Sequence, residues 1–220
     1  MKIIALLPMK GHSERVPNKN MKLFNGIPLF HHVLTTLQNC NLIDEVIINT
    51  DSNIISESAK KFSKVKIHNR PNEICGDFVS MNDIIAFDLN HSDGDIYLQT
   101  HSTNPLLKTT TIHQAIEKFK TQREFDSLFS VTKLQTRLYW EDVRPINHNP
   151  NELIRTQDLP PVFEENSNFF IFTKSSFKNA ANKRIGKKPM MYEMDKLESV
   201  DIDEPHDFIL AETIQQLNLV

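Results

Sequence analysis

Glycine and cysteine are both scarce in this sequence. Only five of the 220 residues are glycine and two are cysteine. The glycine-rich phosphate-binding patterns G-x-x-x-x-G-K-[ST] and G-x-G-x-x-G are both absent, which argues against a P-loop NTPase and a dinucleotide-binding dehydrogenase. Cys40 and Cys75 belong to no C-x-x-C pattern, so neither a disulfide framework nor a zinc site is expected. We expect two reduced thiols in a cytoplasmic protein.

Long apolar runs and a strong net charge are also missing. No run approaches the roughly 20 apolar residues of a membrane-spanning helix, and the N-terminal MKIIALLP is too short for a signal peptide. The formal net charge is −3, so we expect neither nucleic acid nor an anionic membrane as a partner. Any phosphate that this protein binds must therefore meet a local cluster of basic residues.

Short apolar segments alternate with helical patterns along most of the chain. We expect strands at residues 2–7, 45–49, 65–68, 95–99, 127–131 and 169–172, and short extended segments at 190–194 and 199–202. We expect helices at 28–38, from about 52 to 62, and at 81–89, 109–121, 175–182 and 205–217. This alternation predicts an α/β fold, with a mainly parallel sheet flanked by helices on both faces. In such sheets ligands bind beyond the carboxyl ends of the strands.

The alternation breaks between about residues 132 and 165. This stretch contains four prolines, many polar residues and the only tryptophan, Trp140. We expect an insertion of strands and loops that stands off the main sheet, within a single domain of residues 1–220.

A basic loop follows the first expected strand directly. The sequence LLPMKGHSERVPNKN covers residues 6–20, and four positive charges stand between Lys10 and Lys22 against the single Glu14. Several long cationic side chains suit a triphosphate, whose oxygens are spread over several ångströms. A solvated surface loop would carry the same charges. The position at the end of the first strand favours ligand binding.

An acidic pair stands near the end of the chain, in ESVDIDEPHDF. In an extended strand Asp201 and Asp203 would point to the same face, with their Cα atoms roughly 7 Å apart. Two such carboxylates could share Mg²⁺, which takes one or two carboxylates and completes its shell with waters and phosphate oxygens. Alternatively, Asp203 or Glu204 caps the helix that starts at Pro205. Together with the basic loop, the pair predicts a nucleoside triphosphate site with a metal.

These residues resemble a known family, the acylneuraminate (CMP-sialic acid) cytidylyltransferases that activate acidic sugars. The basic loop matches the family's N-terminal motif. Three further segments match in order, namely RPNEICGD at 70–77, RTQDLPPVFEENSNFFIF at 155–172 and SVDIDEPHDFILAE at 199–212. The resemblance spans nearly the whole chain. It implies a Rossmann-like sheet of the nucleotide-diphospho-sugar transferase type, a homodimer, and a dimerisation role for the insertion at 132–165.

The resemblance also implies an activity, namely CMP transfer from CTP to the anomeric hydroxyl of an acidic keto sugar, with Mg²⁺ as cofactor and pyrophosphate as the second product. Sialic, legionaminic, pseudaminic and eight-carbon ulosonic acids are candidate sugars for a role in cell-surface polysaccharide biosynthesis. The catalytic residues would be Lys19 on the triphosphate and Asp201 and Asp203 on the metal. The other residues assigned to the nucleotide are Lys10, Ser13, Arg15, Asn20 and Arg70. Those assigned to the sugar are His101, Thr103, Asn104, Arg155, Gln157, Asn166 and Phe170.

Several positions depart from the family pattern or allow a second interpretation. Lys10 replaces the usual arginine, Glu14 stands where a basic residue is common, and His101 replaces a glutamine. These departures bear on the identity of the sugar more than on the chemistry. Phe170 would form an apolar wall for an N-acyl group, but a core strand explains Phe169 and Phe170 as well.

Two other functions remain open. A nucleotidyltransferase of sugar phosphates would need a glycine-rich loop after the first strand, and this chain has only Gly11 there. A non-catalytic nucleotide-binding module with the same fold would not need to keep Lys19, Asp201 and Asp203 together.

Overall fold

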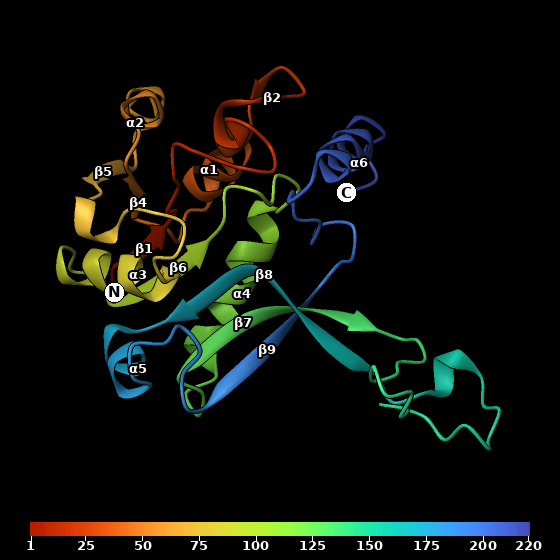
Figure 1. Ribbon diagram of the computed structural model, residues 1–220. Coiled ribbons are helices and arrows are strands. Elements are labelled where there is room, and N and C mark those ends of the chain that lie inside the picture. Colours follow the sequence, from red (N-terminus) through yellow and green to blue (C-terminus); the bar gives the residue numbers. More distant parts are fainter.

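Seven strands form one sheet at the centre of the molecule, in a computed structural model that describes residues 1–220 (Figure 1). They are β1 (Ile3–Leu6), β4 (Glu45–Thr50), β5 (Val65–Asn69), β6 (Ile96–Thr100), β7 (Ser127–Leu134), β8 (Val162–Phe172) and β9 (Pro189–Met194). Their spatial order is β5-β4-β1-β6-β8-β7-β9. Only β8 runs antiparallel to its neighbours, and every other neighbouring pair is parallel. The predicted mainly parallel sheet is therefore confirmed.

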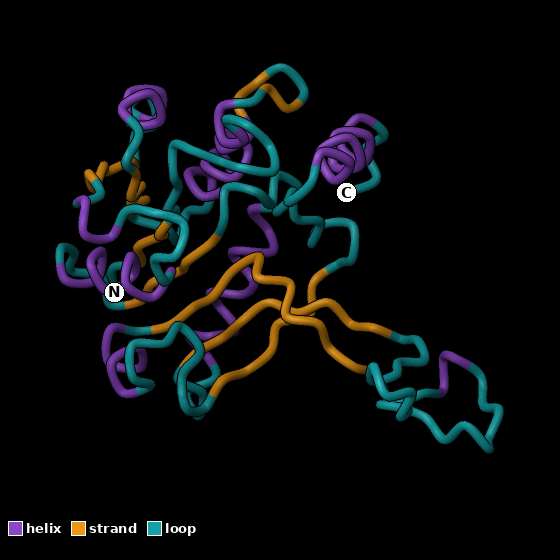
Figure 2. The backbone as a smooth tube through the Cα atoms, in the orientation of Figure 1, coloured by secondary structure: helices purple, strands orange, loops and turns teal.

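Six α-helices and a small hairpin complete the fold (Figure 2). The helices are α1 (Leu29–Asn39), α2 (Asn53–Ala59), α3 (Met81–Asn90), α4 (Thr109–Thr121), α5 (Lys174–Asn179) and α6 (Pro205–Gln216). The hairpin pairs β2 (Leu23–Phe24) with β3 (Ile27–Pro28), and short 3-10 helices lie at Lys19–Met21, Asn72–Ile74 and Thr156–Asp158. No helix is long and apolar enough to cross a membrane.

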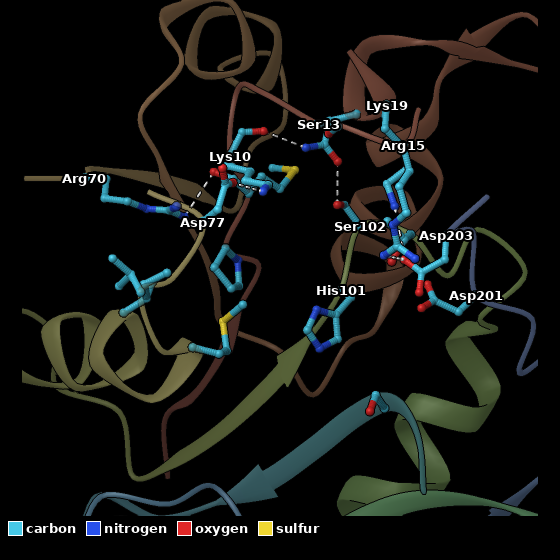
Figure 3. A pocket seen from close by; sticks show the side chains of 18 of the residues that line it. Lys10, Ser13, Arg15, Lys19, Arg70, Asp77, His101, Ser102, Asp201 and Asp203 are labelled. Atoms are coloured by element: carbon cyan, nitrogen blue, oxygen red, sulfur yellow. Dashed lines mark hydrogen bonds and ion pairs between the residues drawn. The ribbon is translucent and has the colours of Figure 1, made fainter. Parts of the chain in front are cut away.

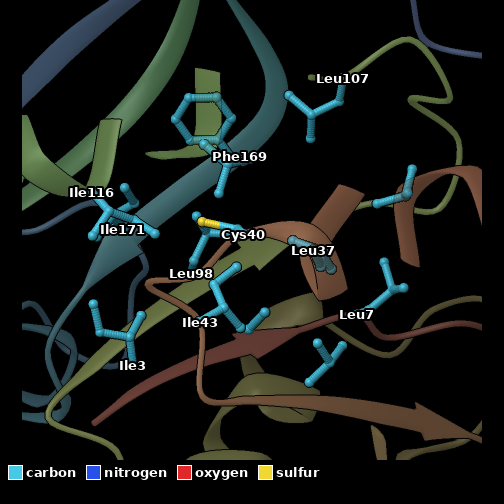
Figure 4. Close-up of a cluster of buried hydrophobic side chains, with 14 of the residues drawn as sticks. Ile3, Leu7, Leu37, Cys40, Ile43, Leu98, Leu107, Ile116, Phe169 and Ile171 are labelled. Atoms are coloured by element: carbon cyan, nitrogen blue, oxygen red, sulfur yellow. The ribbon is translucent and has the colours of Figure 1, made fainter. Parts of the chain in front are cut away.

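The side chains of β1 show why the sheet is covered on both faces. Every residue of β1 is buried, and successive side chains point to opposite faces of a strand. Ile3 and Ala5 pack into an apolar cluster with α1, α2 and α4 (Figure 4). Ile4 and Leu6 pack into a second cluster with α3 and α5. A strand buried on both faces reads as a continuous apolar run, which is the pattern of KIIALL.

Two expectations about strands are corrected. The expected extended segment at 199–202 is not a strand, because Ser199 lies in a turn and the backbone N–H of Ile202 donates to Thr103 O instead (2.9 Å). The strand expected at 169–172 is longer than predicted, because β8 begins at Val162. Its first six residues are exposed or half-buried, and the polar run that begins at Glu164 separates Val162 and Phe163 from the apolar end of the strand.

The stretch at 132–165 comprises the outer ends of β7 and β8 and, between them, an arm at residues 135–161. The arm extends away from the sheet (Figures 1 and 2). Asn147 holds its base together: the Asn147 side chain donates to Thr136 O (2.7 Å) and Pro160 O (2.9 Å) and accepts from Leu138 N (3.1 Å). Both cysteines are free, as expected.

Candidate active site

A cleft of about 450 Å³ opens beyond the carboxyl ends of the parallel strands (Figure 3). The loops after β1, β5 and β6 and the segment before α6 line it. Many of the residues predicted for the site lie there, namely Lys10, Ser13, Arg15, Lys19, Asn20, Arg70, His101, Thr103, Asp201 and Asp203. The structure thus brings together residues from both ends of the chain.

The side chain of Asn20 holds the basic loop after β1 in place. The side chain of Asn20 is buried, donates to Lys10 O (3.0 Å) and accepts from Ser102 Oγ (2.6 Å). This pair of hydrogen bonds ties the loop after β1 to the loop after β6 (Figure 3). Gly11 is needed at the turn of the loop, because a Cβ atom there would lie 2.9 Å from the Cβ atom of Ser52.

The cationic loop and the acidic segment meet in the cleft. The Nζ atom of Lys19 lies 3.5 Å from Asp203 Oδ1 and donates to Ile202 O (2.5 Å). Arg15 reaches the same carboxylate, with Nη2 2.8 Å from Asp203 Oδ1, and also contacts Glu204 (3.2 Å). Lys10 forms an ion pair with Asp77, which also lines the cleft. Lys10, Arg15, Lys19 and Asp203 were predicted to converge from sequence, whereas Asp77 was not assigned to the site and Glu204 was considered only as a cap of the last helix.

The acidic pair is positioned by the residue between its members. Ile202 is fully buried in a third apolar cluster that docks α6 against the hairpin and α1, through Phe24, Leu29 and Phe208. Below Asp203, the carboxylate of Asp207 accepts from the backbone N–H groups of Asp203 (3.1 Å) and Glu204 (2.7 Å). Asp201 and Asp203 therefore line the same cleft, although the strand expected to place them there does not exist.

Asp201 lies in a less polar environment than Asp203. Burial raises the pKa of the Asp201 carboxyl above its ordinary value, and the negative charge of Asp203 acts in the same direction. Asn104 donates weakly to Asp201 Oδ1 (3.4 Å) and to Val200 O (3.5 Å). A cation bound beside Asp201 would oppose the effects of burial and of the Asp203 charge, because it favours the charged form of the carboxyl.

The donor set fits a hard divalent cation only in company with a phosphate. No group of three or more histidine, cysteine, aspartate or glutamate side chains in the molecule is arranged to hold a metal. Mg²⁺ accepts one or two carboxylates when phosphate oxygens and waters fill the rest of its shell, and Asp201 and Asp203 supply those two. The Oδ1 atom of Asn104, whose amide nitrogen contacts Asp201, is buried without a hydrogen-bond partner.

Arg70 is held at the other side of the cleft by buried polar groups. Its Nε donates to Asn49 Oδ1 (2.8 Å), and its Nη2 donates to Asn49 O (2.9 Å) and Met9 O (3.1 Å). The Asn49 amide in turn donates to Asp88 Oδ1 (2.8 Å), which also lies 2.8 Å from His68 Nδ1. Because Asp88 receives the amide NH₂ group, the amide oxygen of Asn49 faces Arg70.

His101 forms part of the wall opposite Arg70. Burial lowers the pKa of His101 to about 4, and the nearby charge of Arg184 acts in the same direction, so the imidazole is neutral at pH 7. Its Nε2 lies 3.3 Å from Gln99 Nε2. The sequence interpretation missed Arg184 and Gln99, because neither lies in a matched motif. The only sequence signals are that Gln99 is a polar residue at the end of an expected strand and that Arg184 is a cation in a loop.

The remaining predicted sugar residues do not line this cleft in the single chain. Phe170 is fully buried in the core, as the alternative interpretation of this strand had it. Asn104 is buried behind Asp201, and the Asn166 amide donates to Thr132 Oγ1 (3.0 Å). Arg155 and Gln157 lie on the arm, where the Arg155 side chain is 73% exposed and paired with Asp158 (2.7 Å).

A family model described as cytidylyltransferase matches residues 4–220. The chain is 31% identical to N-acylneuraminate cytidylyltransferase A of Danio rerio, over 96% of this chain and 50% of that protein. It therefore spans about half the length of this relative and of similar N-acylneuraminate cytidylyltransferases. It is 27% identical to the CMP-N,N'-diacetyllegionaminic acid synthase of Legionella pneumophila, over 99% of this chain and 98% of that protein.

A similar fold occurs in a solved structure, that of a CMP:2-keto-3-deoxy-manno-octonic acid synthetase complexed with CTP. The TM-score is 0.73 at 12% identity, and the match covers 99% of this chain and 100% of that chain. At this level of identity the similarity shows the fold alone, which is the nucleotide-diphospho-sugar transferase type expected from sequence.

Proposed function

The chain belongs to the cytidylyltransferase family, and from this premise we propose that it transfers CMP from CTP to an acidic keto sugar of the sialic-acid type. The anomeric hydroxyl of the sugar attacks the α-phosphorus of CTP, a bond forms between that oxygen and the phosphorus, and pyrophosphate leaves. The names of the similar proteins from Danio rerio and Legionella pneumophila support this class of substrate.

The observation that carries the proposal is the meeting of Lys19 and Arg15 with Asp203. The side chains of Arg15 and Asp203 are both about half exposed, with 56% and 49% of their surface accessible. Exposed ion pairs of this kind contribute only about 0–1 kcal/mol. A triphosphate can therefore displace Asp203 from the two cations at small cost, and the displaced carboxylate becomes available as a metal ligand.

The residues around the phosphates supply positioning and charge. Phosphoryl transfer needs alignment of the attacking oxygen and neutralisation of charge on the phosphates more than covalent chemistry. Lys19, Arg15, Lys10 and Ser13 would surround the triphosphate, and Arg70 and Asn20 would contact the rest of the nucleotide. When bound, Mg²⁺ held by Asp201 and Asp203 would neutralise phosphate charge and make the α-phosphorus a better electrophile.

The arm supports a homodimer. Several of its apolar side chains are exposed, among them Trp140 (57%) and Leu153 (95%), together with Tyr139, Val143 and Ile154. Clustered exposed apolar side chains of this kind mark interaction surfaces. We propose that a second copy of the chain covers them, and that Arg155 and Gln157 then approach the cleft of the partner subunit. We propose that the reaction takes place in the cytoplasm, where CTP is available.

A pyrophosphate-release assay tests this function. The protein is incubated with CTP, Mg²⁺ and, in separate reactions, N-acetylneuraminic, legionaminic, pseudaminic and eight-carbon ulosonic acids, with sugar 1-phosphates as the comparison. We expect release with at least one acid and none with a sugar phosphate. Release with a sugar phosphate alone would reassign the enzyme, and CTP binding without release from any substrate would indicate a non-catalytic module.

A further inference from the structure

Arg184, in the loop between α5 and β9, is a cation of the cleft that forms no ion pair, although the negative charge of Glu165 acts on it from beyond ion-pair distance. It lines the same cleft as His101 and Asp203. Its guanidinium lies over the Phe170 ring, with Cζ 3.8 Å from the ring centre, and Nη1 donates to Gln99 Oε1 (2.7 Å). Lys10, Arg15 and Lys19 are each paired with a carboxylate, whereas Arg184 is not.

An unpaired guanidinium in this position is costly to maintain. Burial lowers the pKa of Arg184, but an arginine side chain stays protonated in proteins, so the charge persists. Partly desolvated charges without a counter-ion are unfavourable and mark functional sites. The contact with Phe170 and the hydrogen bond to Gln99 hold the guanidinium in place and leave its other N–H groups without a protein partner. The fork is therefore preorganised for an anion that comes from outside the chain.

The chemistry of the acceptor indicates which anion this is. In a 2-keto sugar acid the anomeric carbon carries both the attacking hydroxyl and the carboxylate. When the hydroxyl faces the α-phosphorus, the carboxylate must lie a few ångströms away, next to the negatively charged phosphates. A cation is needed there, separate from those that hold the triphosphate. Only Arg70 and Arg184 among the cleft arginines have no ion pair, and Arg70 is committed to Asn49 and Met9 O.

We propose that Arg184 binds the carboxylate of the sugar acid and so selects acidic over neutral sugars. The proposal rests on the function inferred above. It replaces Arg155 in that role, because Arg184 lines the cleft of its own subunit whereas Arg155 lies on the arm and does not. It also explains the buried Phe170: the ring supports the arginine and does not face the sugar as an apolar wall.

Gln99 extends this arrangement to His101. The Gln99 carbonyl oxygen accepts from Arg184, so the amide NH₂ group faces Thr100 O (2.8 Å) and His101 Nε2 (3.3 Å). His101 Nε2 is then the acceptor, and the ring proton of the neutral imidazole sits on Nδ1. Arg184 thus positions His101 as a hydrogen-bond donor through Gln99.

Equilibrium binding tests the proposal without turnover. Calorimetry is done with Mg²⁺ and a CTP analogue in which a methylene group replaces the α–β bridging oxygen. The sugar ligands are the four acids of the pyrophosphate assay and the primary carboxamide of N-acetylneuraminic acid. We expect wild type to prefer the acid over the amide, and Arg184→Gln to bind the acid about tenfold or more weakly while amide binding stays nearly constant. Arg184→Lys keeps the positive charge but loses the forked set of N–H donors. Its affinity for the acid should therefore lie between those of wild type and Arg184→Gln.

Controls separate a carboxylate site from a general disturbance. Lys183→Gln removes the exposed neighbouring charge and should bind like wild type. Arg155→Gln tests the rival residue and should keep the acid-over-amide preference. Affinity for the CTP analogue should stay within about twofold in all variants, because Arg184 is not among the phosphate cations.

Three outcomes would overturn the proposal: a preserved acid-over-amide preference in Arg184→Gln, an equal loss of CTP-analogue affinity in that variant, or no binding of any acid by wild type. Failure of the proposed function gives a different result. Arg184-dependent binding of the acid without pyrophosphate release would retain the carboxylate site and remove the reaction.

Discussion

The Nζ atom of Lys19 and the Oδ1 atom of Asp203 lie 3.5 Å apart, although one residue follows the first strand and the other precedes the last helix. Apolar packing creates this proximity. Ile202 is fully buried with Phe24 and Phe208, so α6 docks beside the basic loop and carries the acidic pair with it. The ion pair itself is weak. Its cations and carboxylates can therefore separate when a metal–triphosphate complex binds between them.

Asp203→Asn should remove turnover without unfolding the protein. The substitution keeps the shape of the side chain but takes away a metal ligand, so we expect the rate of pyrophosphate release to fall by about two orders of magnitude or more. Thermal unfolding should change little, because the lost ion pairs are exposed. Asp93→Asn is the matched control, since Asp93 is an exposed acid that pairs with Lys2 outside the cleft. Turnover of Asp203→Asn at the wild-type rate would contradict the metal role.

Asn49→Ala should weaken CTP binding through Arg70. The change removes the acceptor of Arg70 Nε and the donor to the buried Asp88. We expect KM for CTP to rise several-fold with little change in kcat, and stability to fall by about 1–3 kcal/mol because buried polar groups lose their partners. Asn147→Ala, at the base of the arm, also breaks buried hydrogen bonds and should lower stability without raising KM for CTP. Equal KM effects in both variants would indicate general destabilisation instead.

Trp140→Glu should dissociate the proposed homodimer. A charge on the exposed arm surface must be desolvated if a second copy packs there, so light scattering should show a shift from dimer to monomer. Ile54→Glu is the control, because Ile54 is a similarly exposed apolar residue on α2 (68%) and lies outside the arm. A dimer that survives Trp140→Glu, or a wild type that is monomeric, would refute this interface.

The stability of the fold should decrease on mild acidification. His31 is buried, bonded to Ser58 Oγ (2.9 Å), and burial lowers its pKa from 6.5 to about 4. Between these values the unfolded chain binds a proton that the folded chain does not. The free energy of unfolding therefore falls with decreasing pH, by about 1.4 kcal/mol per unit for one proton. His101 contributes in the same window and sense.

The variant His31→Gln measures how much His31 contributes to the dependence of the unfolding free energy on pH. Glutamine can keep a bond to Ser58 and does not titrate, so urea unfolding between pH 4.5 and 6.5 should show a slope smaller by about one proton than in wild type. An unchanged slope would mean that His31 does not titrate in this range on unfolding.

The core of the fold follows from local patterns, and the details of the site do not. Strand β1 is a continuous apolar run and β4 has the apolar centre VII, because both faces of these strands are covered, and this makes them recognisable in the sequence. The outer half of β8 is exposed or half-buried and mostly polar, so its strand character depends on pairing with β7 and gives no continuous apolar run in the sequence.

Asp201 and Asp203 were expected on the same face because they were placed in a strand, and that strand does not exist. Burial of Ile202, and not strand pairing, places Asp201 and Asp203 at the cleft. Arg184 was missed because the role of a cation in a loop depends on the residues that it contacts in the folded chain. Its contact, Phe170, lies in the strand β8. Tertiary contacts of this kind have no local signature.

The central claim concerns the fate of the α-phosphorus of CTP, and it can be followed directly. CTP labelled with radioactive phosphorus at the α position is incubated with Mg²⁺ and a sugar acid, and the products are separated by chromatography. We predict that wild type moves the label into a conjugate of CMP and the sugar, in an amount equal to the pyrophosphate released, and that Asp203→Asn forms none. Label recovered only in CTP or free CMP, or a γ-phosphate transferred to the sugar instead, would contradict the account.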